Sequence, residues 1–130
     1  MVLFYRGSWC PHCNAQLRAF QHSLDRLADI DVTVVALSVD DEATTQDLIA
    51  THGLRFPVGH SADANAIAHA TGAFVKHDPP YLQSTGFVLD PSGRVVVSVY
   101  SSGAIGRLIP QDVIGQIRYL REHTQASQPQ

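Results

Sequence analysis

The sequence is poor in the features that mark several large classes of protein. It contains only two cysteines in 130 residues, too few for a fold stapled by disulfide bonds. Its 9 Lys and Arg residues are fewer than its 12 Asp and Glu residues and form no cluster, so we expect no nucleic-acid partner. The longest apolar stretch runs only from Val32 to Val39, far short of the ~20 residues that cross a bilayer, so we expect no membrane partner. No glycine-rich nucleotide-binding motif occurs, and we therefore expect no organic cofactor.

We expect no secretion leader at the beginning of this sequence. Its first apolar run, Val2 to Tyr5, has the composition of a buried strand instead. We therefore expect a cytoplasmic protein. This expectation holds for the sequence as given, because a segment upstream of it would carry an address of its own.

The two cysteines are close neighbours at a strand-to-helix junction. They lie in the segment Trp9-Cys10-Pro11-His12-Cys13, directly after the first apolar run, and proline is favoured in the first turn of a helix. A helix start offers unpaired N–H groups and a partial positive charge, and both favour a thiolate over a thiol. A second thiol one turn further along can attack a disulfide formed at the first. Such a pair beside an α/β pattern indicates redox chemistry or metal binding.

The rest of the chain alternates between strand and helix signals. After the cysteines, apolar residues recur at spacings of three and four, and a β-branched run follows, which predicts a parallel βαβ unit. The turn signal Asp90-Pro91-Ser92-Gly93 separates two later apolar runs and predicts an antiparallel hairpin. In order, we expect a strand at 2–5, a helix from Pro11 through Leu27, a strand at 32–39, a helix from Asp40 or Asp41 to His52, an extended piece at 56–58, a helix from Asp63 to Gly72, a loop at 76–84, strands at 85–89 and 94–100, and a helix from Pro110.

These elements fit one α/β domain. We expect it to occupy residues 1–123, with a central mixed sheet flanked by helices, and to be followed by a flexible C-terminal tail over 124–130. The sheet should combine a parallel βαβ half with an antiparallel hairpin half.

This combination, with Trp-Cys-x-x-Cys at the first strand–helix junction, resembles the thioredoxin fold. It is similar in particular to the redoxin branch of that fold, the alkyl hydroperoxide reductase/thiol-specific antioxidant (AhpC/TSA) superfamily, and to its peroxiredoxin-like members with a Cys-Pro-x-Cys motif. The order and spacing of the matching fragments extend over residues 2–122. The fragments are Tyr5–Pro11, Ser38–Asp40, Gly53–Val58, Asp63, Ala70–Gly72 and Gly86–Gly93.

The chain departs from the peroxiredoxin pattern at positions that shape the peroxide pocket. The family has a proline and a threonine or serine before its reactive cysteine, where this sequence has Leu3 and Gly7. It has an arginine near the hairpin strand, where this sequence has Ser84. Thioredoxins have a cis-proline at the Ser84 position and a buried acid at the position of Phe4. The departures favour dithiol exchange over a dedicated peroxidase.

Within the motif, Cys10 is the candidate nucleophile, because the thiolate is the form that attacks disulfides and peroxides. Cys13, one turn deeper in the helix, is the candidate resolving thiol. His12 and Arg6 are expected to help lower the pKa of Cys10, or Arg6 to pair with a carboxylate such as that of Asp40.

Three further groups are expected to support the cysteines. Pro11 begins the helix, and Trp9 packs beside the disulfide. The fold alone places Ser84 and Thr85 opposite Cys10, where their backbone groups would align a substrate.

The favoured hypothesis is a thiol–disulfide oxidoreductase of the peroxiredoxin-like type, suited to antioxidant defence. Cys10 attacks a protein or small-molecule disulfide, Cys13 closes a reversible Cys10–Cys13 disulfide, and an external thiol system of the thioredoxin or glutathione type resets it. The alternative enzyme is a two-cysteine thiol peroxidase that reduces hydroperoxides. An alternative of another class is a metal-binding or carrier module built from cysteine and histidine, although the 7 histidines show no ligand spacing and no metal is expected. A homodimer is a further expectation, because relatives commonly form one.

Overall fold

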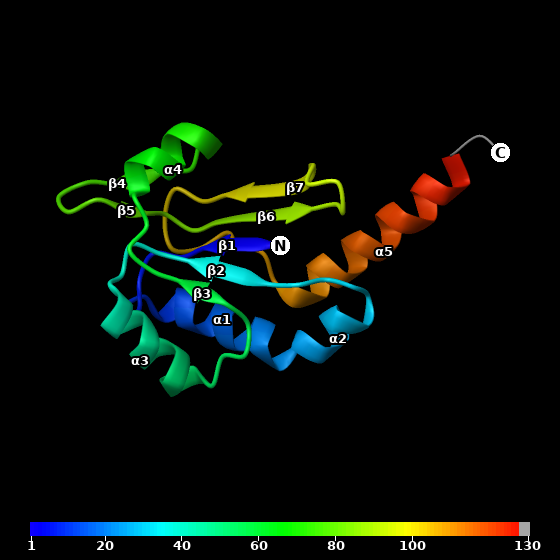
Figure 1. Ribbon diagram of the computed structural model, residues 1–130. Coiled ribbons are helices and arrows are strands. Elements are labelled where there is room, and N and C mark those ends of the chain that lie inside the picture. Colours follow the sequence, from blue (N-terminus) through cyan, green and yellow to red (C-terminus); the bar gives the residue numbers. More distant parts are fainter. Residues whose placement is uncertain (128–130) are drawn as a thin grey trace.

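The computed structural model describes residues 1–127 (Figure 1). Within these residues a five-stranded sheet forms the centre, and a two-stranded hairpin lies beside it. The strands are β1 (Val2–Phe4), β2 (Val35–Leu37), β3 (Val58–Gly59), β4 (Val75–Lys76), β5 (Tyr81–Leu82), β6 (Thr85–Leu89) and β7 (Val95–Tyr100). The helices are α1 (Pro11–His22), α2 (Leu24–Asp29), α3 (Glu42–His52), α4 (Ala64–Thr71) and α5 (Pro110–Ser127).

The central sheet is mixed, with the strand order β3-β2-β1-β6-β7. β1 pairs in parallel with β2, and β2 with β3. On its other side β1 pairs antiparallel with β6, which pairs antiparallel with β7. The α/β architecture predicted from the sequence, a parallel half joined to a hairpin half, is confirmed.

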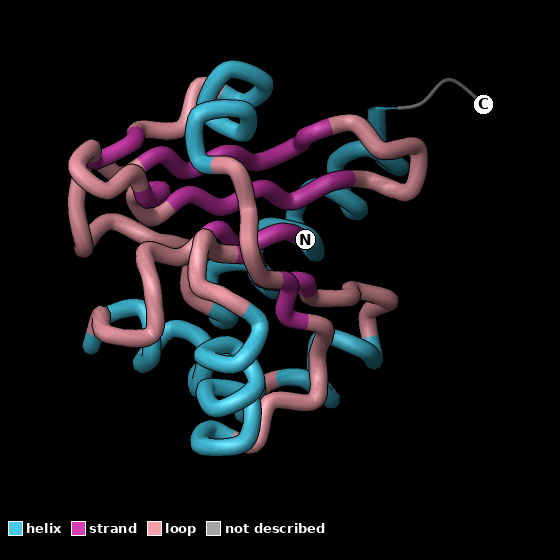
Figure 2. Tube along the Cα trace, turned by 60° about the vertical axis from the view of Figure 1, so that its left-hand side comes forward, coloured by secondary structure: helices cyan, strands magenta, loops and turns pink. Residues whose placement is uncertain are grey.

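Helices cover both faces of this sheet (Figure 2). Successive residues of a strand point to opposite faces, and β1 divides its side chains accordingly. Leu3 joins a large apolar cluster that includes residues of α1, α3 and α5. Phe4 joins a smaller cluster with residues of α4 and β5. The larger cluster contains both cysteines, so the motif lies against the face covered by α1, α3 and α5.

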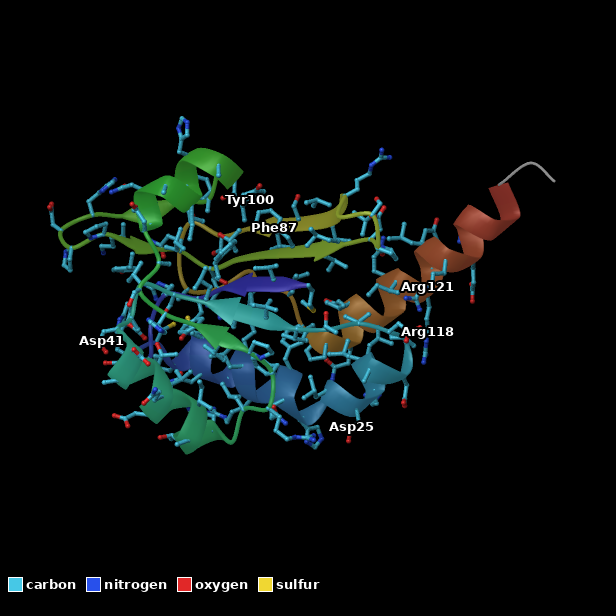
Figure 3. The ribbon with its side chains drawn as sticks, in the orientation of Figure 1. Asp25, Asp41, Phe87, Tyr100, Arg118 and Arg121 are labelled. Carbon is cyan, nitrogen blue, oxygen red and sulfur yellow. The ribbon has the colours of Figure 1, made fainter. Side chains whose placement is uncertain are left out.

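Aromatic side chains of β6 and β7 lie at the edge of the smaller cluster. Phe87 of β6 and Tyr100 of β7 lie close together (Figure 3), with ring centroids 5.5 Å apart. The Tyr100 hydroxyl donates a hydrogen bond to the Thr71 carbonyl oxygen at 2.6 Å. The last residue of α4 is therefore fixed to the edge of the sheet.

Helix ends follow the signals in the sequence. Asp41 caps α3 by accepting a hydrogen bond from the Thr44 N–H at 2.8 Å, and Asp63 caps α4 in the same way. Both helices stop at a glycine in the left-handed region, Gly53 at φ 60° and Gly72 at φ 83°. Residues with a Cβ rarely adopt this conformation, and glycine adopts it freely. The predicted ends of both helices are confirmed.

Three elements differ from the sequence prediction. The helix after the cysteines is divided at Ser23, whose φ of −99° and ψ of 9° depart from helical values. The second strand contracts from 32–39 to Val35–Leu37. The predicted loop at 76–84 contains β5 and the end of β4, which pair with each other. Strands of two residues are too short to show the period of two by which a strand is recognised.

The C-terminal helix is longer than the sequence suggested. α5 continues to Ser127, so the first part of the predicted tail at 124–130 is helical, and residues 128–130 lie outside the described residues. None of the described helices has the length and apolar composition needed to cross a bilayer.

Candidate active site

Cys10 lies at the N-cap of α1, in extended backbone geometry, and Pro11 follows in the first helical turn. The chain reaches this point directly from β1, whose parallel pairing with β2 fixes the direction in which it leaves the sheet. The Cys10 sulfur accepts a hydrogen bond from the Cys13 N–H at 3.3 Å. A thiolate here replaces the serine, threonine or aspartate oxygen that usually caps a helix. The helix start thus points one of its unpaired N–H groups at the Cys10 sulfur.

Both sulfurs are free, and both cysteines have no exposed surface. Each sulfur nevertheless contacts a guanidinium group. Arg6 Nη1 lies 3.7 Å from Cys10 Sγ, and Arg107 Nη2 lies 3.5 Å from Cys13 Sγ. Cys13 Sγ also accepts a hydrogen bond from the Arg6 backbone N–H at 3.4 Å. Two cations therefore meet two buried sulfurs.

The two thiols differ in proton affinity. Burial raises the pKa of Cys10, but hydrogen bonds from the Cys13 thiol and N–H, from Arg6, and the charge of Arg107 outweigh it, so that the pKa lies below its ordinary value. Burial also raises the pKa of Cys13, as does the hydrogen bond its thiol gives to Cys10, and the donors around it offset this only in part. The reduced site therefore favours a thiolate at Cys10 and a thiol at Cys13.

Arg6 is held over the site by neutral groups. Its Nε donates to Gln83 Oε1 at 3.0 Å and its Nη2 to the Tyr81 hydroxyl at 3.2 Å. The guanidinium carbon lies 4.9 Å from the centre of the Trp9 ring and 5.5 Å from that of Tyr81, within the range of cation–π attraction. Asp40, the alternative partner expected for Arg6, instead accepts from the Ser8 N–H at 2.8 Å. The charge of Arg6 is thus directed to Cys10.

Arg107 is the residue of this site that the sequence did not reveal. It lies just before α5, 94 positions from Cys13, in a segment with no motif and no recognised periodicity. Its side chain donates to the carbonyl oxygens of Ala104 and His12 and to Gln16 Oε1. The one available signal was an arginine preceding the apolar pair Leu108-Ile109, which is too common to single out.

The remaining predicted site residues differ in how deeply they are buried. Trp9 is 54% exposed, forms an edge-to-face pair with Tyr81 and packs against Arg6. The His12 side chain is exposed, and it is the His12 carbonyl oxygen that takes part in the site.

Ser84 and Thr85 are buried and belong to the sheet region. The Ser84 carbonyl oxygen accepts from the Ser101 N–H at 2.9 Å, and Thr85 lies in β6 opposite Phe4. Their backbone groups are therefore engaged within the protein. The neighbouring Gln83 is the residue of this segment whose side chain contacts Arg6.

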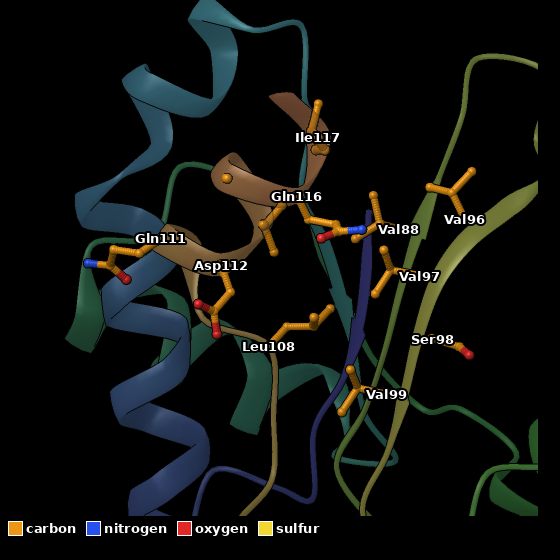
Figure 4. A pocket seen from close by; sticks show the side chains of 12 residues that line it. Val88, Val96, Val97, Ser98, Val99, Leu108, Gln111, Asp112, Gln116 and Ile117 are labelled. Atoms are coloured by element: carbon orange, nitrogen blue, oxygen red, sulfur yellow. The ribbon is translucent and has the colours of Figure 1, made fainter. Parts of the chain in front are cut away.

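Two other features of the described residues bear on the choice of site. Over residues 1–127, no group of three or more His, Cys, Asp or Glu side chains is placed to hold a metal ion. The groove in Figure 4 lies between β7 and α5, lined by apolar residues such as Val97 and Leu108, and neither cysteine lines it.

A family model described as the AhpC/TSA family matches residues 1–98. The chain belongs to the AhpC/TSA family. A peroxiredoxin of Methanothermobacter thermautotrophicus is 29% identical over 129 residues, which cover 92% of this chain and 59% of the relative. This AhpC/TSA chain therefore spans about three fifths of the length of that peroxiredoxin.

Solved structures of AhpC/TSA proteins show the same fold. Peroxiredoxin 6 of Arenicola marina superposes with a TM-score of 0.76 at 19% identity, over 95% of this chain and 61% of the other. AhpC of Enterococcus faecalis gives a TM-score of 0.75 at 20% identity, over 95% of this chain and 77% of the other. The thioredoxin-like fold and the redoxin family predicted from the sequence are confirmed.

Proposed function

We propose that this chain is a two-cysteine thiol peroxidase, with Cys10 as the nucleophile and Cys13 as the resolving thiol. The observation that carries the proposal is the contact of the Arg6 guanidinium with a buried, helix-capping Cys10 sulfur. Membership of a family that includes peroxiredoxins supports a hydroperoxide substrate more strongly than the general disulfide exchange that the sequence favoured.

The proposed reaction has two covalent steps. The Cys10 thiolate attacks the outer oxygen of a hydroperoxide, the O–O bond breaks, and the products are a Cys10 sulfenic acid and an alkoxide that takes a proton to become an alcohol, or water if the substrate is hydrogen peroxide. Cys13 then attacks the Cys10 sulfur and displaces hydroxide, which leaves as water with the proton of the Cys13 thiol. The two thiols have lost two electrons to the peroxide, and a disulfide remains.

One departure from the peroxiredoxin pattern, the missing arginine at the Ser84 position, has a counterpart in the structure. The family arginine near the hairpin strand is replaced by Ser84, but Arg6 brings a guanidinium to the nucleophilic sulfur from the segment after β1. A cation beside the attacking sulfur favours the thiolate and the negative charge that develops on the departing oxygen. The chemistry therefore does not require an arginine at the Ser84 position.

The burial of the two sulfurs supports a small substrate. Neither cysteine has exposed surface, and Arg6 and Trp9 stack over the approach to Cys10. A peroxide needs only a narrow path to the sulfur, whereas a protein disulfide must bring two backbones with it. Resetting the Cys10–Cys13 disulfide by an external dithiol then requires the Arg6–Trp9 stack to move.

The test is the rate at which the fully reduced protein reacts with hydrogen peroxide, tert-butyl hydroperoxide and the disulfides of insulin. Trp9 is the single tryptophan and lies next to Cys10, so its fluorescence reports each step in a stopped-flow instrument. We expect both peroxides to oxidise the protein faster than they oxidise an equal concentration of free thiolate, and insulin to be reduced slowly. Peroxide rates no greater than those of free thiolate, with rapid reduction of insulin, would overturn the peroxidase proposal in favour of disulfide exchange.

A further inference from the structure

Arg107 is a cation held beside Cys13 with no carboxylate to balance it. Over the described residues, its partners are the carbonyl oxygens of Ala104 and His12, Gln16 Oε1 at 2.8 Å and Cys13 Sγ at 3.5 Å. The sole ion pair in the same part of the chain joins Arg55 and Asp25. A guanidinium bound only by neutral acceptors keeps its full charge. The sulfur of Cys13 is therefore the one partner of Arg107 that can become an anion.

Gln16 fixes the position of Arg107. Gln16 is buried in α1, and its Nε2 donates to the Leu108 carbonyl oxygen at 2.9 Å. This bond leaves Oε1 turned toward Arg107 Nη1. The amide of Gln16 thus joins α1 to Arg107 and to the next residue, Leu108, and holds the guanidinium beside Cys13.

The groups facing Cys13 come from three segments. Cys10 faces it from the start of α1, and Tyr5 and the Arg6 N–H face it from the segment after β1. Burial raises the pKa of the Tyr5 hydroxyl above its ordinary value, so it stays neutral near neutral pH. The guanidinium of Arg6 lies on the other sulfur. Arg107, from the segment before α5, is the cation in direct contact with Cys13.

We propose that Arg107 is a catalytic residue of the resolving step, in which its guanidinium stabilises the Cys13 thiolate that attacks the oxidised Cys10 sulfur. This role rests on the proposed peroxidase, because it concerns the second half of the same cycle. In the reduced protein the Cys13 thiol donates to the Cys10 thiolate. Once Cys10 is a neutral sulfenic acid, that anion is gone, and Cys13 must lose its own proton before it can attack.

In the resolving step, an S–S bond forms as the S–O bond of the sulfenic acid breaks. The thiol proton of Cys13 leaves, and the anionic sulfur next to Arg107 donates an electron pair to Cys10 Sγ. The S–O bond of the sulfenic acid breaks, hydroxide departs, and the thiol proton converts it to water. As the disulfide forms, the negative charge next to Arg107 disappears. Arg107 therefore stabilises an anion that exists during resolution and not in its product.

The decisive experiment separates Arg107 from peroxide chemistry. In a Cys10→Ser background, Cys13 is the single thiol, and its ionisation is followed by thiolate absorbance and by the rate of alkylation with iodoacetamide across pH. Adding Arg107→Gln should move the midpoint to higher pH, with about a 10-fold smaller thiolate fraction near neutral pH, because a pKa change of one unit is a tenfold change. Arg107→Lys should retain most of the effect. An unchanged midpoint in Arg107→Gln would overturn the proposal.

The second measurement uses the two-cysteine protein. Oxidation by hydrogen peroxide should give a fast fluorescence phase for sulfenic acid formation and a later phase for closure of the disulfide. We expect Arg107→Gln to slow the later phase about 10-fold at neutral pH and to shift its pH midpoint upward by the same amount as in the titration. The first phase should change less, because Arg6 contacts Cys10 directly. If peroxide oxidises the wild-type protein no faster than free thiolate, the peroxidase proposal fails, while the titration still decides the role of Arg107.

Controls distinguish the charge from the hydrogen bonds that tie the segment down. Arg121→Gln removes the same charge and a hydrogen bond to the Ile30 carbonyl oxygen at a distant point of α5, and should leave both midpoints unchanged. If Arg107→Gln does not fold, Gln16→Glu retains an oxygen acceptor for Arg107 and balances its charge with a carboxylate, while removing the N–H that donates to the Leu108 carbonyl oxygen. The Cys13 midpoint should then rise. Equal slowing by Arg107→Gln and Arg107→Lys, with no shift in midpoint, would show a structural role and overturn the proposal.

Discussion

The two sides of the cysteine pair bring a cation to sulfur by different means. On one side, Arg6 is stacked against Trp9 and Tyr81 and hydrogen-bonded to Gln83. On the other, Arg107 is bound by two carbonyl oxygens and by Gln16. Both arginines have a buried glutamine as a neutral acceptor, and neither has a carboxylate partner within the described part of the chain.

The difference lies in the groups that hold each cation. Arg6 packs against two aromatic rings, of which Trp9 is 54% exposed, and donates to one amide and one phenol oxygen. The opposite side is clamped between α1 and the segment before α5 by hydrogen bonds to backbone and amide oxygens. The two cations are therefore supported by different chemistry, aromatic rings on the Arg6 side and backbone and amide oxygens on the Arg107 side.

The pKa values of the two thiols are shifted in opposite directions, although neither cysteine has exposed surface. Both cysteines are fully buried, but Cys10 is the acceptor at the helix cap, whereas Cys13 is the donor inside the first turn. The first N–H groups of a helix have no partner within the helix, so they can donate to a side chain at the N-cap position, where Cys10 lies. Position along the helix therefore distinguishes the two sulfurs, and the charges of Arg6 and Arg107 act on them in addition.

The largest expected effect comes from removing the Cys10 sulfur, which lies on the Arg6 side of the pair. Cys10→Ser should reduce the rate of oxidation by hydrogen peroxide by about 10³-fold or more, because a serine hydroxyl is not ionised near neutral pH. Stopped-flow Trp9 fluorescence, with mass spectrometry of the product, measures this. Oxidation of Cys13 at the wild-type rate in this variant would show that the roles of the two cysteines are reversed.

Removing the sulfur on the Arg107 side should separate the two halves of the cycle. In Cys13→Ser the first oxidation should persist within about 10-fold of wild type, since Cys10 loses one hydrogen-bond donor and retains Arg6. The product should be a Cys10 sulfenic acid, detected by dimedone labelling, in place of a disulfide. Formation of an intermolecular disulfide as fast as the wild-type disulfide would contradict the assignment of Cys13 as the resolving thiol.

Removing the charge of Arg6 measures how much this cation contributes to the ionisation of Cys10. A cation favours the charged form of a thiol, so Arg6→Gln should raise the pKa of Cys10 and move the midpoint of its alkylation rate to higher pH by about one unit. Below that midpoint the peroxide rate should fall about 10-fold. Arg6→Lys is the matched control for charge. No shift in Arg6→Gln would indicate that the Cys13 thiol and N–H and the charge of Arg107 lower the pKa of Cys10 without Arg6.

The smallest change removes one hydrogen bond that orients Arg6. Tyr81→Phe keeps the ring beside Trp9 and deletes the hydroxyl that Arg6 Nη2 donates to. This hydrogen bond has a charged donor, but Arg6 keeps its bond to Gln83 and its contacts with both rings without it. We therefore expect a loss of about 1 kcal/mol, which is about a 5-fold slower peroxide reaction, with the second phase unchanged. Slowing of the second phase alone would show that the two sides of the site are coupled.

Much of the fold could be predicted because its signals are local. Asp41 and Gly53 mark the ends of α3 by their own side-chain and backbone chemistry, and the turn Asp90 to Gly93 joins β6 to β7. The hairpin of β4 and β5 escaped prediction, because strands of two residues carry no readable period. This omission matters for the site, since Tyr81 of β5 is a partner of Arg6.

The sequence by itself determined the dithiol and its place at a helix start, because the cap, the proline and the second thiol all lie within one turn of α1. It also determined the α/β order of the elements, through periodicity and caps. The tertiary structure alone decided which cation meets which sulfur. Arg107 reaches Cys13 only after α5 packs against the sheet, and Gln83 reaches Arg6 only after β6 pairs with β1. Electrostatic contacts between distant segments depend on distance in space, and no local pattern of residues encodes that distance.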